Sequence, residues 1–397
     1  MHGFLRLLVG CTACLSFAQL AAAQEPLKIG VLGDMSGMYE AMSGKGSVVA
    51  AQMAIDDMGG SVLGRKVEVV TGDSQNKPDI ASGLAKRWFE NENVMMITDN
   101  WGSSVGLAVQ VEARRVNRIA LFSGAGTADL SGKECSPTGF VWTFDTTTLA
   151  RAIATTLVKQ GLDTWYFLTP DFVFGHQAEE TATQIVTSLG GKVLGSSKFP
   201  LTNVDFSSFL ITAQASKAKV IVMTGGDIAS AMKQAAEFGI LAGGQKFATI
   251  VLYLPYARAI GPKLGEGLYV TNSFYWDLNE QTRAWSQRYF EKVGAEPTMN
   301  HAGTYSSTLH YLQAVQKAGT VDTDAVVAAM RAAPVSDATA HGTLRSDGRL
   351  VRDYYMWQMK GPSESKSEWD LLKPVKHIPA EEIVPSLAES GCPLAMK

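Results

Sequence analysis

The sequence predicts an α/β fold made of two similar lobes, each built on a mainly parallel sheet. Short apolar runs alternate with amphipathic stretches of helical length, which is typical of βαβ units. The pattern restarts after about residue 149 with a similar order of elements. The chain has 397 residues, 46% of them hydrophobic, which suits two cores better than one.

The first half of the chain contains four predicted strands, separated by helices. The run at 27–32 is apolar almost throughout, as expected for a strand buried on both faces of a parallel sheet. In chain order, the strands lie at 27–32, 66–71, 94–98 and 119–122, and the helices at 43–58, 80–92 and 105–116.

The second half repeats this alternation and then departs from it. Its predicted strands lie at 165–168, 192–198, 220–223 and 247–251, with helices at 149–160, 177–189, 206–215 and 228–238. Further helices are predicted at 281–292, 305–317 and 323–332. The aromatic stretch at 353–360 is typical of an antiparallel strand and not of a βα unit.

The first 23 residues have the pattern of a secretory signal peptide. Arg6 is followed by a mostly apolar run at 7–20 and by three alanines at 21–23, the small residues that a signal peptidase accepts. The apolar run is shorter than the roughly 20 residues that a membrane-spanning helix needs, which disfavours a retained anchor. A lipoprotein signal ending at Cys11 is a second alternative, although cleavage there leaves almost no apolar region before it. The pattern therefore predicts export to the periplasm.

Cysteine usage agrees with an exported protein. Removal of the signal peptide would leave Cys135 and Cys392, an even pair in an oxidising compartment. A disulfide between them would tie the C-terminus back to the first half of the chain. Two unpaired thiols remain the alternative.

Charge and motifs argue against several classes of function. The formal net charge is -3, and no basic stripe typical of nucleic-acid binders is present. No cluster of His, Cys and Asp has the spacing of a metal site. The glycine-rich stretches lack a P-loop lysine, and no G-x-G-x-x-G opens a first βαβ turn. We therefore expect no nucleic-acid partner, no metal and no cofactor.

Loops that follow predicted strands carry groups suited to an anionic ligand, because ligands bind beyond the carboxyl ends of parallel strands. The loops at 100–104 and 123–127 are each predicted to end a strand and to open a helix. Small residues there let a ligand approach the backbone, and free N–H groups at a helix start favour an anion. The alternative is that the Ser and Thr side chains only cap helices. The candidate carboxylate-binding residues are Ser103, Ser104, Ala125, Gly126 and Thr127.

Aromatic residues accompany these loops and predict walls for an apolar or planar ligand. Each ring taken singly is also explained by core packing, Trp276 especially. The rings are Tyr39, Trp101, Phe172, Phe174, Tyr253, Tyr256, Phe274, Tyr275 and Trp276.

One catalytic motif competes with this interpretation. Residues 102–106 match the G-x-S-x-G nucleophile elbow, with Ser104 as the nucleophile. A hydrolase also needs a later acid and a His, and no histidine follows a strand beside an acid partner. A secreted serine hydrolase is therefore a remote alternative, and we expect no enzymatic activity.

The order and spacing of several short motifs together resemble a known family. They are Lys28–Gly37, Leu63–Val67 with Gly72-Asp73, Ser123–Leu130, Asp171–Gly175 and Val204–Ser207. Along nearly all of the chain after residue 23, the sequence resembles the leucine/isoleucine/valine-binding family of type I periplasmic solute-binding proteins. The resemblance implies a substrate-binding component of an ABC uptake transporter, acting as a monomer with a membrane permease as its partner.

The family fold implies two Rossmann-like lobes with mainly parallel sheets, joined by a three-crossing hinge and closing over a ligand. We place the crossings near Thr146, Asn272 and Arg345. The resulting N-terminal lobe is 24–146 plus 273–345. The C-terminal lobe is 147–272 plus 346–397, with a tail that returns towards Cys135.

The resemblance also indicates what kind of ligand is bound. Family members that bind amino acids hold the carboxylate at the positions of Ser103 or Ser104 and of Ala125, Gly126 and Thr127, all of which suit this role. They commonly have Tyr where this chain has Phe174, and an acid in the stretch that here reads 252–256 without one. Burying an ammonium without a partner costs several kcal/mol.

We therefore predict a small, aromatic carboxylate as the ligand, and the stretch at 274–278 resembles relatives of aromatic-acid binders. An amino acid or short amide that uses Asp227 as the acceptor is the alternative. The predicted ligand-binding residues are Tyr39, Trp101, Ser103, Ser104, Ala125, Gly126, Thr127, Phe172, Phe174, Gly226, Asp227, Tyr253 and Tyr275.

Overall fold

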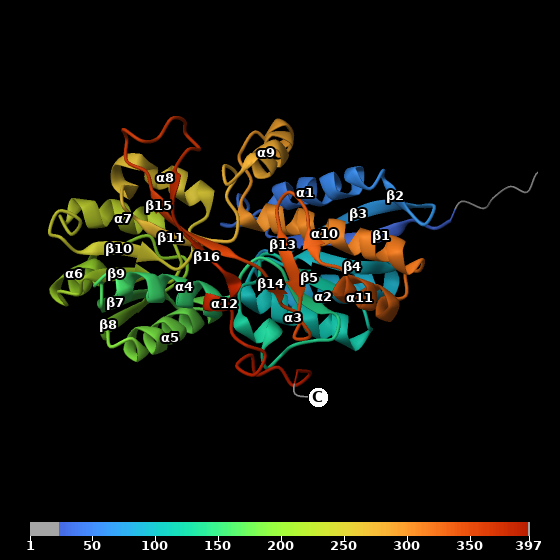
Figure 1. The fold of residues 1–397 in the computed structure, drawn as a ribbon, viewed down its shortest axis with the longest axis horizontal. Helices are drawn as coiled ribbons and strands as arrows, with labels where there is room; N and C mark the ends of the chain where they lie inside the picture. The colour runs from blue at the N-terminus through green and yellow to red at the C-terminus, as the bar shows by residue number, and fades with distance from the viewer. Residues whose placement is uncertain (1–23, 396–397) are drawn as a thin grey trace, which may run out of the picture.

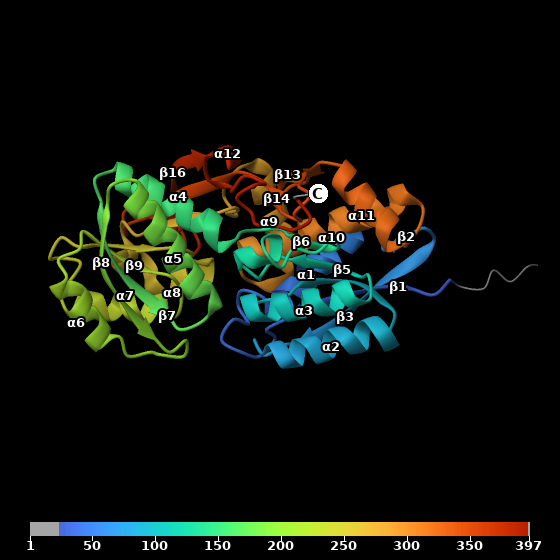
Figure 2. The same cartoon turned by 90° about the horizontal axis from the view of Figure 1, so that it is seen from below.

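Two sheets flanked by helices form two lobes that lie side by side (Figures 1 and 2). The computed structural model describes residues 24–395, so the predicted signal peptide lies outside the described residues. Within the described part, no helix combines the length and the apolar character required to cross a bilayer. The α/β class with mainly parallel sheets is confirmed.

The first lobe is built on a six-stranded sheet. Its strands are β1 (Leu27–Gly33), β2 (Ser61–Val62), β3 (Arg65–Asp73), β4 (Val94–Asp99), β5 (Ile119–Phe122) and β6 (Gly139–Val141), in the order β2-β3-β1-β4-β5-β6. Every pairing except the β2–β3 hairpin is parallel. Its helices are α1 (Gly44–Asp57), α2 (Pro78–Asn91), α3 (Ser103–Arg115), the 3-10 turn η1 (Ala128–Ser131), α9 (Glu280–Val293), α10 (Met299–Ala318) and α11 (Thr323–Ala332).

The second lobe is built on a seven-stranded sheet. Its strands are β7 (Thr164–Pro170), β8 (Lys192–Phe199), β9 (Val220–Met223), β10 (Lys246–Thr249), β11 (Tyr269–Asn272), β15 (Tyr354–Met359) and β16 (Leu372–Ile378), in the order β16-β15-β11-β10-β9-β7-β8. As predicted, β15 is antiparallel to its neighbours. The helices are α4 (Thr146–Lys159), α5 (Val173–Ser188), α6 (Ser207–Ala215), α7 (Ile228–Glu237), α8 (Leu254–Gly265) and α12 (Ala380–Ile383).

The chain passes between the sheets at three places. The first passage lies between β6 and α4 and the second between β11 and α9. The third follows the small sheet of β12 (Val335–Ser336), β13 (His341–Leu344) and β14 (Leu350–Val351). Because β14 pairs with β13, and Arg349 bridges to Val141 of β6, we propose that this passage lies at 352–353 and not near Arg345.

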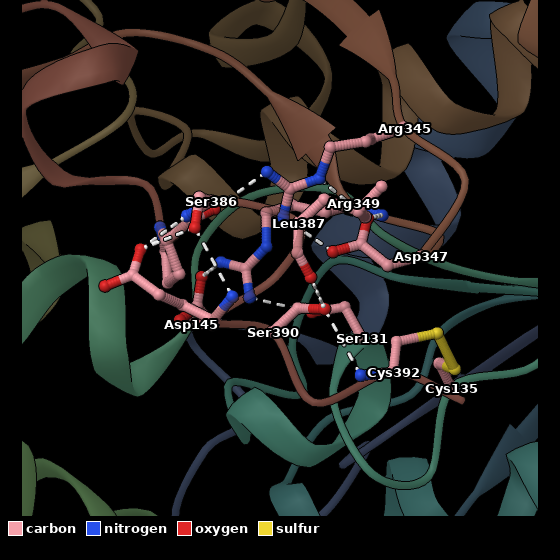
Figure 3. A network of polar contacts seen from close by, with 12 residues as sticks. Ser131, Cys135, Asp145, Arg345, Asp347, Arg349, Ser386, Leu387, Ser390 and Cys392 are labelled. Carbon is pink, nitrogen blue, oxygen red and sulfur yellow. Dashed lines mark hydrogen bonds and ion pairs between the residues drawn. A yellow bond between two sulfur atoms is a disulfide. The ribbon is translucent and has the colours of Figure 1, made fainter. Parts of the chain in front are cut away.

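A polar network and a disulfide join the tail to the first lobe on the hinge side (Figure 3). The predicted disulfide between Cys135 and Cys392 is present. Arg349 is buried, pairs with Asp145 ahead of α4, and donates to Ser131 Oγ of η1 at 2.9 Å. Arg345 donates to the carbonyl oxygen of Pro385 in the tail at 2.7 Å. The tail, which leaves the second lobe after β16, is thus held covalently to the first.

Sequence patterns missed some elements for identifiable reasons. The predicted helix at 305–317 begins six residues earlier, at Met299, because its first turns are polar yet buried. Asn300 and His301 there hydrogen-bond to the chain near Met42 and Ser43, so they carry no apolar periodicity. The stretch at 252–256 was predicted to be a loop, but α8 begins within it at Leu254. Pro255 lies in the first turn of α8, a position where proline is tolerated.

Candidate functional site: a cavity between the lobes

A cavity between the two lobes collects the loops that follow the parallel strands. From the first lobe, the loops after β1, β4 and β5 contribute Tyr39, Trp101, Gly102, Ser103, Gly124 and Gly126. From the second, the segments after β7, β9 and β10 contribute Phe172, Phe174, Gly225, Gly226, Ile228, Val251, Tyr253 and Tyr256. Asn76 and Phe144 complete the lining. This is the position that the strand-end rule predicts.

The cavity wall is a continuous series of aromatic rings that crosses from one lobe to the other. The Trp101 ring centroid lies 5.2 Å from that of Tyr39 and 5.1 Å from that of Tyr253. Phe144 lies 6.4 Å from Tyr253 and 6.1 Å from Phe174. All five of these side chains are at most 8% exposed, so the wall is largely shielded from solvent and favours a flat apolar ligand.

Hydrogen-bond donors without partners lie at one end of the cavity. The Ser103 side chain is 4% exposed, and its Oγ has no hydrogen-bond partner among residues 24–395. Ser103 opens α3, whose first N–H groups have no partner inside the helix and carry the positive end of its dipole. A buried unpaired hydroxyl is unusual, because such groups normally find a partner. The arrangement is suited to an anionic group.

The turn that leads into α3 requires unusual backbone angles. Asp99, Asn100 and Gly102 have φ values of 73°, 56° and 97°. Asn and Asp adopt this left-handed region more readily than most residues, and Asn100 is held there by a 2.9 Å bond from Nδ2 to the carbonyl oxygen of Leu121. Glycine is favoured at residue 102 because its φ of 97° strains any L side chain, and a Cβ there would also lie 2.3 Å from Asn76 Oδ1. The turn places Trp101 and Ser103 together at the cavity.

Glycine is also required where the second loop meets the rings. A Cβ on Gly126 would lie 2.3 Å from Phe144 Cε2 and 2.8 Å from Phe174 Cε2. A Cβ on Gly124 would lie 2.9 Å from Trp101 Cε3. The bare backbone of this loop is therefore what allows the rings to pack against it.

Three predicted carboxylate residues do not line the cavity. Ser104 is exposed on α3. Ala125 is buried against α3, and its Cβ is 2.5 Å from where a Cβ on Gly106 would lie. Thr127 caps η1 by accepting from the Asp129 N–H at 3.2 Å, and its hydroxyl donates to Gln177 Oε1 at 2.7 Å. Thr127 therefore caps a helix, which was the alternative to binding a carboxylate.

Two further predicted residues, Asp227 and Tyr275, also lie outside the lining. Asp227 caps α7, because its carboxylate accepts from the N–H of Ser230 at 3.0 Å and from its Oγ at 2.6 Å. The Tyr275 hydroxyl donates to the carbonyl oxygen of Trp369 at 3.0 Å and accepts from the Leu371 N–H at 3.1 Å, which fixes it under β16. Gly226, which precedes Asp227, does line the cavity. The other seven predicted residues also line it.

Sequence reasoning missed Phe144 and did not single out Tyr256. Phe144 lies in the first passage between lobes, where no strand end marks it. Tyr256 was named among the loop aromatics but not among the predicted ligand-binding residues. It lies on the first turn of α8 and lines the cavity. Burial raises the pKa of Tyr256 to about 12, so its hydroxyl stays neutral. Within residues 24–395, the cavity lining thus contains no side chain that is charged at neutral pH.

Comparison with known proteins identifies relatives along nearly the whole chain. A family model described as periplasmic binding protein matches residues 26–366. A periplasmic binding protein from Burkholderia mallei is 38% identical, with a TM-score of 0.90 over 93% of this chain and 99% of that one. A branched chain amino acid ABC transporter periplasmic ligand-binding protein from Burkholderia xenovorans LB400 is 36% identical, with a TM-score of 0.86 over 93% and 100%.

A more distant structure shares the fold. It is the solute binding protein of an ABC transporter from Rhodopseudomonas palustris BisB5, solved in complex with 3,4-dihydroxy benzoic acid. Its identity to this chain is 22%, with a TM-score of 0.81 over 89% of this chain and 98% of that one.

Proposed function

We propose, from the premise that the chain belongs to the periplasmic binding protein family, that its ligand is a small aromatic carboxylate. The chain is a solute-binding component of an ABC transporter, and the two lobes form a clamp around the cavity. The proposal concerns which ligand the clamp holds and how the clamp recognises it.

The observation that carries the proposal is the unpaired hydroxyl of Ser103 at the start of α3. A ligand carboxylate that meets Ser103 Oγ and the first N–H groups of α3 would satisfy donors that otherwise have no partner. The Gly124–Gly126 backbone lies beside this end and lets the ligand approach closely. Among the described residues, Ser103 Oγ is the one buried side-chain polar atom of the lining that has no hydrogen-bond partner.

The rest of the cavity supports an aromatic body and disfavours an α-ammonium group. Seven of the sixteen lining residues are aromatic, and among the described residues the lining has no carboxylate to pair with a cation. Asp227, the acceptor in the amino-acid alternative, has both carboxylate oxygens bonded to Ser230. An ammonium ion would therefore be desolvated without a partner, at a cost of several kcal/mol. In the Rhodopseudomonas palustris protein the same fold holds a dihydroxybenzoate.

The hydrolase alternative finds no support in the geometry. Ser104 is exposed, and no histidine of residues 24–395 hydrogen-bonds to it. A serine nucleophile needs such a base within hydrogen-bond reach. We propose that the chain binds its ligand without chemistry, that it is exported through a cleaved signal at 1–23, and that it acts as a monomer with a membrane permease.

A thermal-shift panel on the exported chain tests the ligand class. We would compare benzoate and 4-hydroxybenzoate with benzamide, benzyl alcohol, leucine and phenylalanine. A ligand at 100 times its Kd stabilises the folded chain by about 2.7 kcal/mol, which is a measurable rise in Tm. We expect a rise with the benzoates and none with the neutral isosteres. A rise with leucine or phenylalanine alone would replace the proposal by the amino-acid alternative.

A further inference from the structure

Asp99 lies beneath the cavity wall and joins the segments that form it. It is the last residue of β4 and is fully buried. One carboxylate oxygen accepts from Ser43 Oγ at 2.6 Å and the other from Asn300 Nδ2 at 3.0 Å. These partners come from the end of the Tyr39 loop and from α10. A single buried carboxylate therefore fixes two segments that are far apart in the sequence.

The backbone of Asp99 holds the second ligand loop. Its carbonyl oxygen accepts from the N–H groups of Ser123 at 3.2 Å and Gly124 at 3.0 Å. Asp99 also begins the left-handed turn that presents Trp101. The loops that carry Tyr39, Trp101 and Gly124 thus all meet at this residue, which itself does not line the cavity.

In the part of the chain that the structure describes, the groups that face this carboxylate supply no positive charge at neutral pH. From the loop after β1 comes Asp34, a second buried carboxylate, which accepts from the Tyr39 N–H at 3.1 Å. From α10 comes His301, whose Nε2 is 3.1 Å from the carbonyl oxygen of Ser43. Burial lowers the pKa of His301 to about 4, so the ring is neutral. The hydroxyl of Tyr253 approaches from the residue ahead of α8 and that of Tyr289 from α9, and burial raises the pKa of both.

Desolvation therefore acts on Asp99 without compensation by a cation. Burial raises the pKa of Asp99 to about 6, although hydrogen bonds from Ser43, Asn300 and Ser47 oppose the rise. Ser103, the proposed carboxylate donor, follows four residues later along the same turn. An anion bound there would repel the ionised form of Asp99 and raise its pKa further, because a like charge nearby disfavours ionisation.

We propose that Asp99 is a positioning residue of the ligand site and that it takes up a proton from solvent when an anionic ligand binds. The inference deepens the proposed function and rests on it. The proton adds to one carboxylate oxygen of Asp99 and turns the carboxylate into a neutral carboxyl group. Protonation thus removes the negative charge of Asp99 from the neighbourhood of the bound anion.

The direction of the pH dependence follows from this linkage. The pKa of Asp99 is higher in the complex than in the free protein, so binding takes up a proton between the two values. Affinity therefore rises as the pH falls from the pKa of Asp99 in the complex towards its pKa in the free protein, about 6. Below about pH 6 the affinity levels off. Each unit by which the ligand raises the pKa of Asp99 corresponds to about a tenfold gain in affinity.

Isothermal titration calorimetry with benzoate tests the proposal. Titrations between pH 5.5 and 8.5 in buffers of different ionisation enthalpy count the protons taken up. We expect wild-type uptake near pH 7 and an affinity that falls roughly tenfold from pH 6 to pH 8. Asp99→Asn should bind without uptake and with a flat pH profile. Asp79, on α2, is exposed. The Asp79→Asn variant removes the same charge and should behave as wild type.

The outcomes separate this inference from the proposed function. Benzoate binding without proton uptake, or with equal uptake in Asp99→Asn, would overturn the role of Asp99 and leave the ligand class standing. If no benzoate binds at any pH, both are wrong. Should Asp99→Asn not fold, carboxyl carbon NMR of the wild type decides. The Asp99 resonance must titrate at higher pH with benzoate than without it, and an unchanged midpoint rejects the proposal.

Discussion

The Thr127 hydroxyl of the first lobe donates a 2.7 Å hydrogen bond to Gln177 Oε1 on α5 of the second lobe. Thr146, in the first passage between the lobes, reaches the same oxygen at 3.3 Å. Residue 127 was predicted to bind the ligand. Its hydroxyl instead contributes to the contact between the lobes next to the cavity. This position links it to closure of the clamp.

Removing this interlobe bond should accelerate ligand release. A hydrogen bond of this kind contributes about 1 kcal/mol, so Gln177→Ala should raise koff for benzoate roughly fivefold with little change in kon. Stopped-flow fluorescence of the cavity tryptophan, Trp101, measures both rates. Gln184→Ala, an exposed glutamine on the same helix, is the control and should leave koff unchanged. Equal rates in wild type and Gln177→Ala would show that the bond has no part in closure.

Ser103 and Ser104 should differ sharply although they are adjacent. Hydrogen bonds to charged groups contribute about 1.5–3 kcal/mol, so Ser103→Ala should weaken benzoate binding by roughly 10- to 100-fold. Ser104→Ala should have no effect, because that side chain is exposed and outside the lining. Titration calorimetry of both variants checks this. A loss of affinity in Ser104→Ala with Ser103→Ala intact would reverse our assignment of the carboxylate site.

A single methyl group at residue 126 should obstruct the site. Gly126→Ala places a Cβ against Phe144 and Phe174, and overpacking of this kind costs about 1–3 kcal/mol. If this cost falls on the complex, benzoate affinity should drop by roughly 5- to 150-fold. Gly83→Ala on α2, where a Cβ would meet nothing within 4 Å, should bind normally and be slightly more stable. Undiminished binding by Gly126→Ala would mean that the rings move freely away from this loop.

The disulfide should contribute to stability but not to ligand recognition. Cys135 and Cys392 are separated by 257 residues, and neither lines the cavity. The paired variant Cys135→Ser, Cys392→Ser should lose about 2–4 kcal/mol of unfolding free energy in urea, with unchanged benzoate affinity. Wild type with added reductant is the matched comparison. A large fall in affinity would instead indicate that the tail restrains the lobes.

Buried His301 should make stability depend on acidity. Because burial lowers its pKa from 6.5 to about 4, the unfolded chain binds this proton more tightly than the folded chain does. Its contribution to the unfolding free energy is complete above pH 6.5 and is lost as the pH falls towards 4, by up to roughly 3 kcal/mol. Urea denaturation across this range should show a shallower loss in His301→Gln. The exposed His341→Gln is the control, and an identical profile in all three proteins would contradict the prediction.

Most of the fold was predictable because buried parallel strands are readable as apolar runs. All residues of β4 are buried, and β4 was predicted to within one residue. The elements that escaped prediction have polar or short sequences, such as the first turns of α10. There, Thr304 pairs with Ser123 Oγ at 2.7 Å, a contact between residues far apart in the chain. No local pattern records such a partner.

The candidate site was predictable as a set of loops but not as a set of contacts. Trp101, Phe174 and Tyr253 follow strands, so the sequence places them at the edge where a ligand binds. Thr127 and Asp227 follow strands equally well but cap η1 and α7. A hydroxyl or carboxylate that caps a helix has the same chemistry as one that binds a ligand, and only the direction of the side chain separates the two.

The amino-acid order by itself determined the alternation of strands and helices, the doubled lobe, the pair of cysteines and the loops that face the cleft. These depend on local periodicity and on which strand ends share an edge. The tertiary structure decided that Ser103 and not Ser104 faces the cavity, that Thr127 joins the lobes, and that Asp99 is buried without a cation. Those properties depend on the direction of a side chain and on neighbours that the fold brings from distant segments, and neither is encoded in local sequence.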